Sequence, residues 1–114
     1  MPSVEQIKAS VHRYLELVDH GTAVELAALY ADDATLEDPV GSEPKVGRAA
    51  IGEFYKVIEP IERSAQLVSL HAAGDTAVFE FSIVTVFGDT TVELTPADIM
   101  VFDAAGKIVS MRAV

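Results

Sequence analysis

The spacing of the apolar residues changes once along this chain of 114 residues, close to Pro60. Before that proline, apolar side chains recur mainly every three or four residues, which is the period of one face of an α-helix. After it they recur every second residue, as in strands that bury one face. Helices followed by strands indicate an α+β domain in which the helices pack on one face of a bent sheet.

Capping signals and turn residues divide the chain into elements. Ser3 with Gln6, and Thr22 with Glu25, have the spacing of capping boxes at the starts of two helices. The predicted helices run from about Val4 to His20, from after Thr22 to near Tyr30 and from about Arg48 to Glu59. A short strand is predicted from Ala34 to Asp38. Four antiparallel strands are predicted from Glu62 onward, and they include Thr76 to Phe87 and Thr91 to Phe102. No repeat or linker interrupts this order, so we predict one domain over residues 1–114, with three N-terminal helices on a curved, mainly antiparallel sheet.

The charge balance excludes some classes of partner. The chain has 18 acidic and 8 basic residues, a formal net charge of −10. Such a surface repels phosphate, so we expect neither nucleic-acid binding nor attachment to anionic membranes, and a neutral or apolar small molecule is the better ligand. The start of the chain does not resemble a signal peptide, and no apolar stretch is long enough to span a membrane. A cytoplasmic protein is therefore expected.

The residues that usually carry metal or cofactor chemistry are absent or badly spaced. The chain has no cysteine, which excludes disulfides, thiolate metal sites and cysteine nucleophiles. His12, His20 and His71 have no metal-ligand spacing. No phosphate-binding loop or dinucleotide-binding motif occurs. An enzyme with this sequence is predicted to work without metal or cofactor, through carboxyl and phenol groups.

Asp98 falls on the apolar side of a predicted strand. In the strand from Thr91 to Phe102, it shares a face with Leu94 and Met100. Burial disfavours a charged carboxylate and raises its pKa, so that the neutral acid could donate a hydrogen bond. Pro96 leaves an alternative open, in which a bulge shifts the register and turns Asp98 to solvent.

Asp38 ends the short predicted strand and precedes Pro39. A residue before proline is held in an extended conformation, so the carboxylate is rigidly placed beside a loop, where catalytic groups often lie. Taken alone, however, the pattern favours an aspartate that only starts a turn.

All three tyrosines of the chain, Tyr14, Tyr30 and Tyr55, fall on the inward faces of predicted helices. A buried ring leaves a hydroxyl that needs a partner. For Tyr30 and Tyr55 taken singly, a backbone group or water is a sufficient partner. Together, the three are predicted to point into one core.

Several stretches of the chain resemble the bacterial ketosteroid isomerases: Tyr30 to Gly41 (YADDATLEDPVG), Arg13-Tyr14, Phe54-Tyr55, Pro96-Ala97-Asp98 and Gly106 to Met111. The resemblance runs from the first helix to the last residue. Each stretch is common in the wider nuclear-transport-factor-2-like superfamily, but the combination of Tyr14, Asp38 and Asp98 is more specific. Ketosteroid isomerases are a known example of a carboxylic acid kept neutral by an apolar site.

The resemblance implies a cofactor-independent steroid Δ-isomerase, which converts 3-oxo-Δ5-steroids to 3-oxo-Δ4-steroids through a dienolate. Asp38 would carry the proton from C4 to C6, and Tyr14 with protonated Asp98 would form the oxyanion hole. Tyr55 and Tyr30 match the hydrogen-bond chain that supports Tyr14. The resemblance also implies a homodimer and an apolar substrate pocket, whose positions match Val18, Phe54, Leu94, Met111 and Ala113.

Two alternatives remain open because this fold hosts many functions. One is a lyase, cyclase or hydrolase that acts on another polycyclic or terpenoid ligand, and the other is a steroid-binding module without catalysis. A binding module does not need the full set of Tyr14, Asp38 and Asp98. An epoxide hydrolase of this fold would need an Asp-Arg-Asp network, and Arg112, the only arginine late in the chain, is predicted on the face opposite Met111.

Overall fold

The computed structural model describes residues 2–114, which form three helices and one seven-stranded sheet. The helices are α1 (Val4–His20), α2 (Ala23–Ala27) and α3 (Arg48–Lys56), and the strands are β1 (Tyr30–Glu37), β2 (Lys45–Val46), β3 (Glu62–Ala73), β4 (Thr76–Phe87), β5 (Thr90–Leu94), β6 (Ala97–Phe102) and β7 (Ile108–Ala113). The strand order is β2-β1-β7-β6-β4-β3, and β5 pairs with β4. Only β1 and β7 pair in parallel among these described strands. The predicted α+β class and the mainly antiparallel sheet are confirmed.

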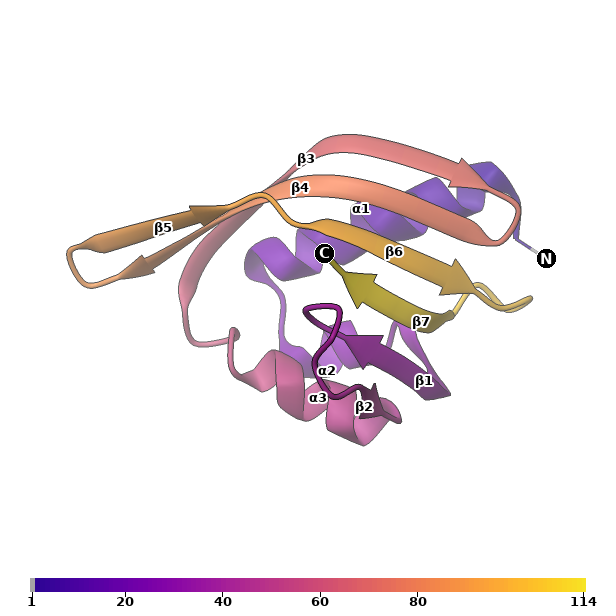
Figure 1. The fold of residues 1–114 in the computed structure, drawn as a ribbon, viewed down its shortest axis with the longest axis horizontal. Helices are drawn as coiled ribbons and strands as arrows, with labels where there is room; N and C mark the ends of the chain where they lie inside the picture. Colours follow the sequence, from indigo (N-terminus) through magenta and orange to yellow (C-terminus); the bar gives the residue numbers. More distant parts are fainter. Residues whose placement is uncertain (1) are drawn as a thin grey trace.

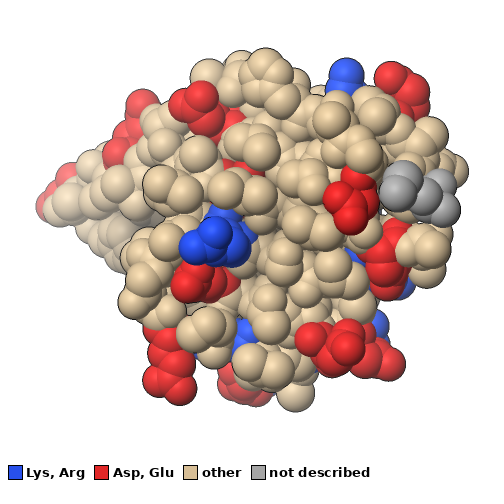
Figure 2. All heavy atoms as spheres, turned by 45° about the vertical axis from the view of Figure 1, so that its right-hand side comes forward, with Lys and Arg blue, Asp and Glu red and all other residues tan. Residues whose placement is uncertain are grey.

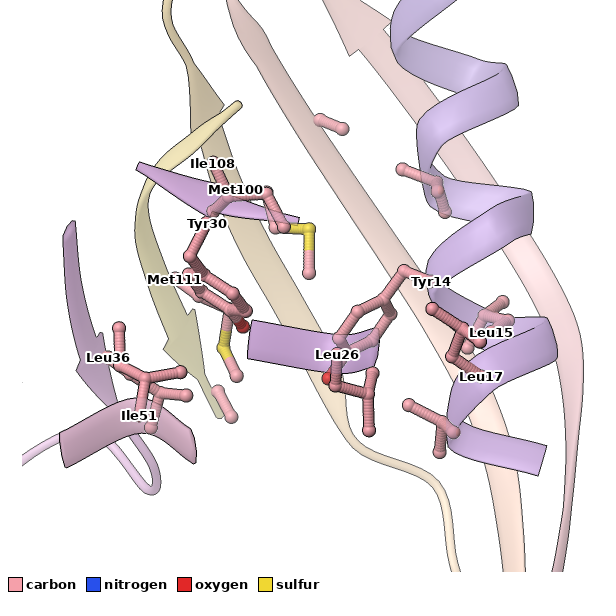
Figure 3. Close-up of a cluster of buried hydrophobic side chains, with 14 of the residues drawn as sticks. Tyr14, Leu15, Leu17, Leu26, Tyr30, Leu36, Ile51, Met100, Ile108 and Met111 are labelled. Carbon is pink, nitrogen blue, oxygen red and sulfur yellow. The ribbon is translucent and has the colours of Figure 1, made fainter. Parts of the chain in front are cut away.

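The curved sheet and the helices enclose one core. Figure 1 shows α1 crossing behind β3 and β4, with α2 and α3 near the β1 and β2 side of the sheet. The β4–β5 hairpin extends beyond the rest of the molecule in the same view. The core contains aromatic, aliphatic and methionine side chains from all three helices and the sheet, including Tyr14, Leu26, Tyr30, Ile51, Met100 and Met111 (Figure 3).

The first helix forms as predicted because its local signals agree. Both hydrogen bonds of the Ser3–Gln6 capping box are present, and α1 runs from Val4 to His20. Its apolar stripe buries Ile7, Val11, Tyr14 and Val18, while His12 and His20 are exposed.

Element ends account for most of the differences from the prediction. The Thr22–Glu25 capping box is present, but α2 ends at Ala27, and Tyr30 begins β1 instead of closing a helix. The strand therefore begins four residues before the predicted Ala34. The third helix ends at Lys56 rather than Glu59, and β2 was not predicted.

The described part of the second half forms five strands, and the prediction of four is wrong. The run from Thr91 to Phe102 is interrupted at Pro96, which has no backbone N–H to donate to a neighbouring strand. As a result, β6 pairs with the first half of β4 and β5 pairs with its second half. Asp98 still faces inward, with 1% of its surface exposed, so the alternative of a register shift that turns it to solvent is wrong.

Arg63 at the start of β3 holds the ends of two helices together. Its Nε donates to the Val18 carbonyl oxygen at 2.6 Å, and its Nη2 donates to that of Gly21 at 2.7 Å. Its Nη1 donates to the carbonyl oxygens of Ile58 and Glu59 at 3.1 and 3.0 Å. One side chain thus donates to carbonyl groups at the end of α1 and just after the end of α3, where helical N–H partners run out.

The surface carries few basic groups. On the face shown in Figure 2, acidic side chains are scattered and outnumber basic ones, and most of the surface is uncharged. Within residues 2–114, no helix combines the length and the apolar character needed to cross a membrane.

Candidate active site

A cavity of about 260 Å³ lies between α1, α3 and the sheet. Most of its wall is apolar, and the polar side chains come from Tyr14, Asp38, Tyr55, Thr85 and Asp98. The lining residues are Tyr14, Val18, Asp38, Phe54, Tyr55, Ile58, Phe81, Ile83, Thr85, Leu94, Pro96 and Asp98. An apolar cavity with a few converging ionisable groups is a typical small-molecule site.

Asp98 is a buried carboxyl group on this wall. It lies on β6 between Phe79 of β4 and Ala113 of β7, and among residues 2–114 its Oδ2 has no hydrogen-bond partner. Burial raises the pKa of Asp98 to about 7; the charge of Asp38 adds to this rise, and the Tyr14 hydroxyl opposes it. A buried polar atom without a partner is rare in folded proteins. Near neutral pH, much of Asp98 is therefore the neutral acid, with a hydrogen available for a ligand.

The three tyrosines form a chain of hydroxyl groups beside Asp98. The Tyr55 hydroxyl lies 3.2 Å from that of Tyr14 and 2.5 Å from that of Tyr30, and all three residues are buried. They come from α1, β1 and α3, so the tertiary fold brings them together, as the sequence predicted. Burial raises the pKa of each tyrosine well above its usual value. All three hydroxyls therefore stay protonated at neutral pH.

Asp38 lies where the cavity opens. It follows the last residue of β1, and much of its side chain is exposed. Partial burial still raises the pKa of Asp38 above its ordinary value of 3.8. Asp38 also lines an adjoining cavity of about 390 Å³, which shares Leu94 and Pro96 with the first. The carboxylate is thus accessible to solvent and to a ligand that spans both cavities.

The structure places the predicted apolar pocket residues in three settings. Val18, Phe54 and Leu94 line the cavity beside Asp98. Ala113 lines the adjoining cavity near Asp38. Met111 is buried in the core, where it lies opposite Met100 and Leu36 on the neighbouring strands, and lines neither cavity (Figure 3).

Part of the wall was not anticipated from the sequence. Phe81, Ile83 and Thr85 of β4 line the cavity, and so does Ile58 after α3. The alternation along β4 was visible in the sequence. Whether this face of β4 lies beside Asp98 depends on which strands pair. In the structure β4 pairs with β6, and Phe79 lies opposite Asp98 on the same face of the sheet.

A larger cavity, of about 520 Å³, lies between α2 and α3 and is lined by three basic side chains. Arg48 donates to the Tyr30 carbonyl oxygen and pairs with Asp32 at 2.8 Å. Lys56 pairs with Glu53 at 2.9 Å, and Lys107 donates to the Ala28 carbonyl oxygen at 2.8 Å. Because these cations already have partners within the chain, the cavity beside Asp98 is the better candidate site.

Residues 2–114 contain no cluster of three or more histidine, aspartate or glutamate side chains placed to hold a metal ion. The ionisable side chains that line the cavity beside Asp98 are carboxyl and phenol groups.

Comparison with known proteins places the chain among related sequences and folds. A model of the SnoaL-like domain matches residues 11–111. A relative named steroid Delta-isomerase, from Nocardioides simplex, is 47% identical over 108 residues, which are 95% of this chain and 88% of the relative. Among solved structures, SalBIII, described as an epoxide hydrolase/cyclase-like enzyme in pyran ring formation in polyether salinomycin, superposes with a TM-score of 0.91 at 26% identity. That match covers 99% of this chain and 92% of SalBIII.

Proposed function

The chain belongs to the SnoaL-like domain family and is a homologue of a steroid Δ-isomerase, and from this premise we propose that it converts 3-oxo-Δ5-steroids to 3-oxo-Δ4-steroids. One observation carries the proposal beyond the homology. The unpartnered Oδ2 of Asp98 lies in an otherwise apolar cavity beside the Tyr14 hydroxyl. Two neutral donors at one place suit an oxygen that gains negative charge during the reaction.

Asp38 is the base in this proposal. Its carboxylate removes a proton from C4 of the steroid, and the electrons of the broken C–H bond move toward the 3-oxo oxygen to give a dienolate. The same carboxyl group then returns the proton to C6, and the double bond becomes conjugated with the carbonyl group. The raised pKa of Asp38 supports this role, because a more basic carboxylate takes a proton more readily.

Tyr14 and Asp98 donate hydrogen bonds to the dienolate oxygen. When Tyr30 donates to Tyr55 and Tyr55 donates to Tyr14, the hydrogen of Tyr14 is free to point into the cavity. The apolar wall excludes water, which strengthens both hydrogen bonds relative to solution. A carboxylate is a weak base for a carbon acid, so these donors supply much of the catalysis.

The shape of the site supports an extended apolar substrate. The cavity beside Asp98 is slightly smaller than the pockets of about 300–1,000 Å³ that usually hold small molecules. The adjoining cavity continues it past Asp38, Leu94 and Pro96. Together the two cavities offer a rigid polycyclic ligand more room than the first cavity alone, with the reacting ring beside Asp98 and Asp38.

The test is a spectrophotometric assay with 5-androstene-3,17-dione, in which the product is followed by its conjugated-enone absorbance. We expect turnover by the wild type and a loss of about 10²–10⁴-fold in Asp38→Asn, which removes the base. Asp33→Asn changes an exposed aspartate on β1, the strand that Asp38 follows, and is the matched control, with turnover unchanged. A wild type that forms no product, or an Asp38→Asn variant that keeps its rate, would contradict the proposal.

A second candidate function is ring formation or epoxide opening, and the likeness to SalBIII favours it. That chemistry was expected to need an arginine between two aspartates. Arg112 does not line the cavity, and its Nε donates to Glu37 Oε1 at 3.0 Å on the opposite face of the sheet. Steroid isomerisation therefore fits the residues of this site better.

A homodimer is part of the proposal. The outward side of the sheet carries exposed apolar residues that suit a second copy of the chain, including Val68 on β3 and Val78 on β4, which are 59% and 40% exposed. Light scattering during size-exclusion chromatography should give the mass of two chains. A mass of one chain over a wide range of concentrations would contradict this part.

A further inference from the structure

Thr85 is the polar side chain of the cavity wall that the proposed reaction does not use. The reacting end of the cavity is marked by Asp98 and Tyr14, while the wall near Thr85 is formed by apolar neighbours such as Ile83 and Leu94. Thr85 is partly exposed in the structure, but a ligand that fills the cavity would cover its hydroxyl, and burying a polar group without a partner costs free energy. A hydrogen-bonding group of the ligand would supply that partner.

The strand register places Thr85 far from the oxyanion donors along the same face. Phe79 of β4 lies directly opposite Asp98, and side chains two residues apart on a strand share a face. Thr85 is six residues beyond Phe79, which is three positions further along this face of β4. Over this length β4 leaves β6 and continues into the projecting hairpin with β5 (Figure 1). In that hairpin Thr85 lies opposite Val92.

The Thr85 hydroxyl is only weakly engaged within the protein. Its Oγ1 lies 3.4 Å from the Val92 carbonyl oxygen. Good hydrogen bonds between oxygen atoms are near 2.7–2.8 Å, so this contact is long. Little is lost when the hydroxyl turns from Val92 to a ligand oxygen.

We propose that Thr85 is a second polar anchor of the site, which hydrogen-bonds an oxygen at the end of the steroid remote from the reacting carbonyl. The proposal rests on the proposed function and names its substrate class more closely. The cavity binds 3-oxo-steroids that carry an oxygen on the D ring in preference to those that end in a bare hydrocarbon. Asp98 and Tyr14 hold one end of the ligand, and Thr85 holds the other.

The experiment compares two substrates in three proteins. The substrates are 5-androstene-3,17-dione and 5-androsten-3-one, which differ by the oxygen at C17, and the proteins are the wild type, Thr85→Val and Ser82→Val. Valine matches the shape of threonine and lacks the hydroxyl. Ser82 is the control, because it lies on the same strand but alternates with Phe81 and Ile83, which line the cavity, and so faces the other side of the sheet.

The ratio of the two kcat/KM values isolates the proposed hydrogen bond, since effects of the mutation on folding or on the base act on both substrates. We expect Thr85→Val to reduce the preference for the C17 oxygen by about 3- to 10-fold, the size of one neutral hydrogen bond. Ser82→Val should leave the preference as in the wild type. An unchanged preference in Thr85→Val, or an equal loss in Ser82→Val, would overturn the anchor.

A binding measurement separates this proposal from the proposed function. If the wild type turns over neither substrate, isothermal titration with 4-androstene-3,17-dione and 4-androsten-3-one gives the same ratio from dissociation constants. A preference for the 17-oxo ligand that Thr85→Val removes would support the anchor although the proposed reaction had failed. Absence of binding, or a preference that Thr85→Val retains, would overturn it.

Discussion

Asp98 and Asp38 are the same residue type at one cavity, and their surroundings give them different properties. Asp98 is 1% exposed, and its pKa is raised to about 7, so it is partly neutral at physiological pH. Asp38 directly follows β1 and is less buried than Asp98. Its pKa is also raised, but by partial burial alone, and the charge of Asp98 does not contribute. The difference shows that position in the fold decides how strongly the pKa of a carboxyl group is raised, and this is why we propose Asp98 as a donor and Asp38 as the base.

The largest expected effect is the loss of folding stability when the buried carboxyl group of Asp98 ionises. Because its pKa in the folded state is raised from 3.8 to about 7, the folded state retains a proton that the unfolded chain loses, and wild-type stability falls as the pH rises through this window. The loss amounts to about 4 kcal/mol at most, from about three pKa units at ~1.4 kcal/mol each.

Asp98→Asn cannot ionise, so its free energy of unfolding relative to the wild type should grow between pH 4 and pH 8. Chemical denaturation at several pH values measures this difference. Asp38 and all other titrating groups are present in both proteins and cancel to first order. A difference that stays constant with pH would mean that Asp98 has an ordinary pKa.

The next effect concerns the donor role of Asp98. Asp98→Ala removes one of the two donors that we propose for the dienolate, and we expect the turnover number in the steroid assay to fall about 10²–10³-fold. Asp98→Asn keeps an N–H donor at the same place and should lose less. A ranking in which alanine is the better replacement would exclude a hydrogen-bond role for this side chain.

A smaller effect is expected at the other wall of the cavity, where Arg63 holds the carbonyl groups of Val18 and Ile58. Arg63→Met removes the donor to the Val18 carbonyl oxygen and one of the two donors to that of Ile58, which also accepts from the Ile61 N–H, and should destabilise the fold by about 1–3 kcal/mol. The Michaelis constant should rise because both residues line the cavity.

Lys107→Met is the control for Arg63→Met, since Lys107 also donates to a backbone carbonyl, that of Ala28, but lies outside the cavity. Thermal unfolding and steady-state kinetics on both variants test the prediction. An equal rise of the Michaelis constant in Lys107→Met would show that the effect of Arg63 is not specific to the cavity wall.

The smallest effect is expected at the far end of the tyrosine chain. Tyr30→Phe removes the hydroxyl that contacts Tyr55, two positions away from the ligand. We expect the turnover number to fall by less than about 10-fold, the size of one neutral hydrogen bond acting through another. Tyr14→Phe, which removes the donor itself, should cost about 10²–10³-fold. Equal losses in the two variants would contradict a chain that acts through Tyr14.

Much of the fold could be predicted from the sequence where local signals agree. The capping box at Ser3 and the apolar stripe set both the bounds of α1 and the inward side of Tyr14. Alternation around Met100 correctly placed Asp98 on the buried face of its strand. These features depend only on residues that lie close together in the sequence. The helix or strand period then fixes which side of the element each side chain faces.

Predictions that depended on distant partners were less complete. Tyr30 was predicted at the end of a helix and instead begins β1, where it pairs with Ile108 of β7. Because of the break at Pro96, β4 pairs with β6 along its first half and with β5 along its second half. Thr85 lies in the second half and lines the cavity. A propensity pattern contains no information on which strands will pair.

The sequence by itself determined which side chains turn inward, including three tyrosines and an aspartate that lies among apolar residues. Only the tertiary structure decided which of these side chains meet. The hydroxyl groups of Tyr14, Tyr30 and Tyr55 meet although the residues come from three elements. The parallel pairing of β1 with β7 places the last residue of β1, Glu37, beside Arg112, and Asp38 follows directly. The face of a residue follows from the regular period of its own segment. Its neighbours in space depend on contacts between segments that are far apart in the sequence. Bringing such segments together costs conformational entropy, and only the packing of the whole core offsets that cost.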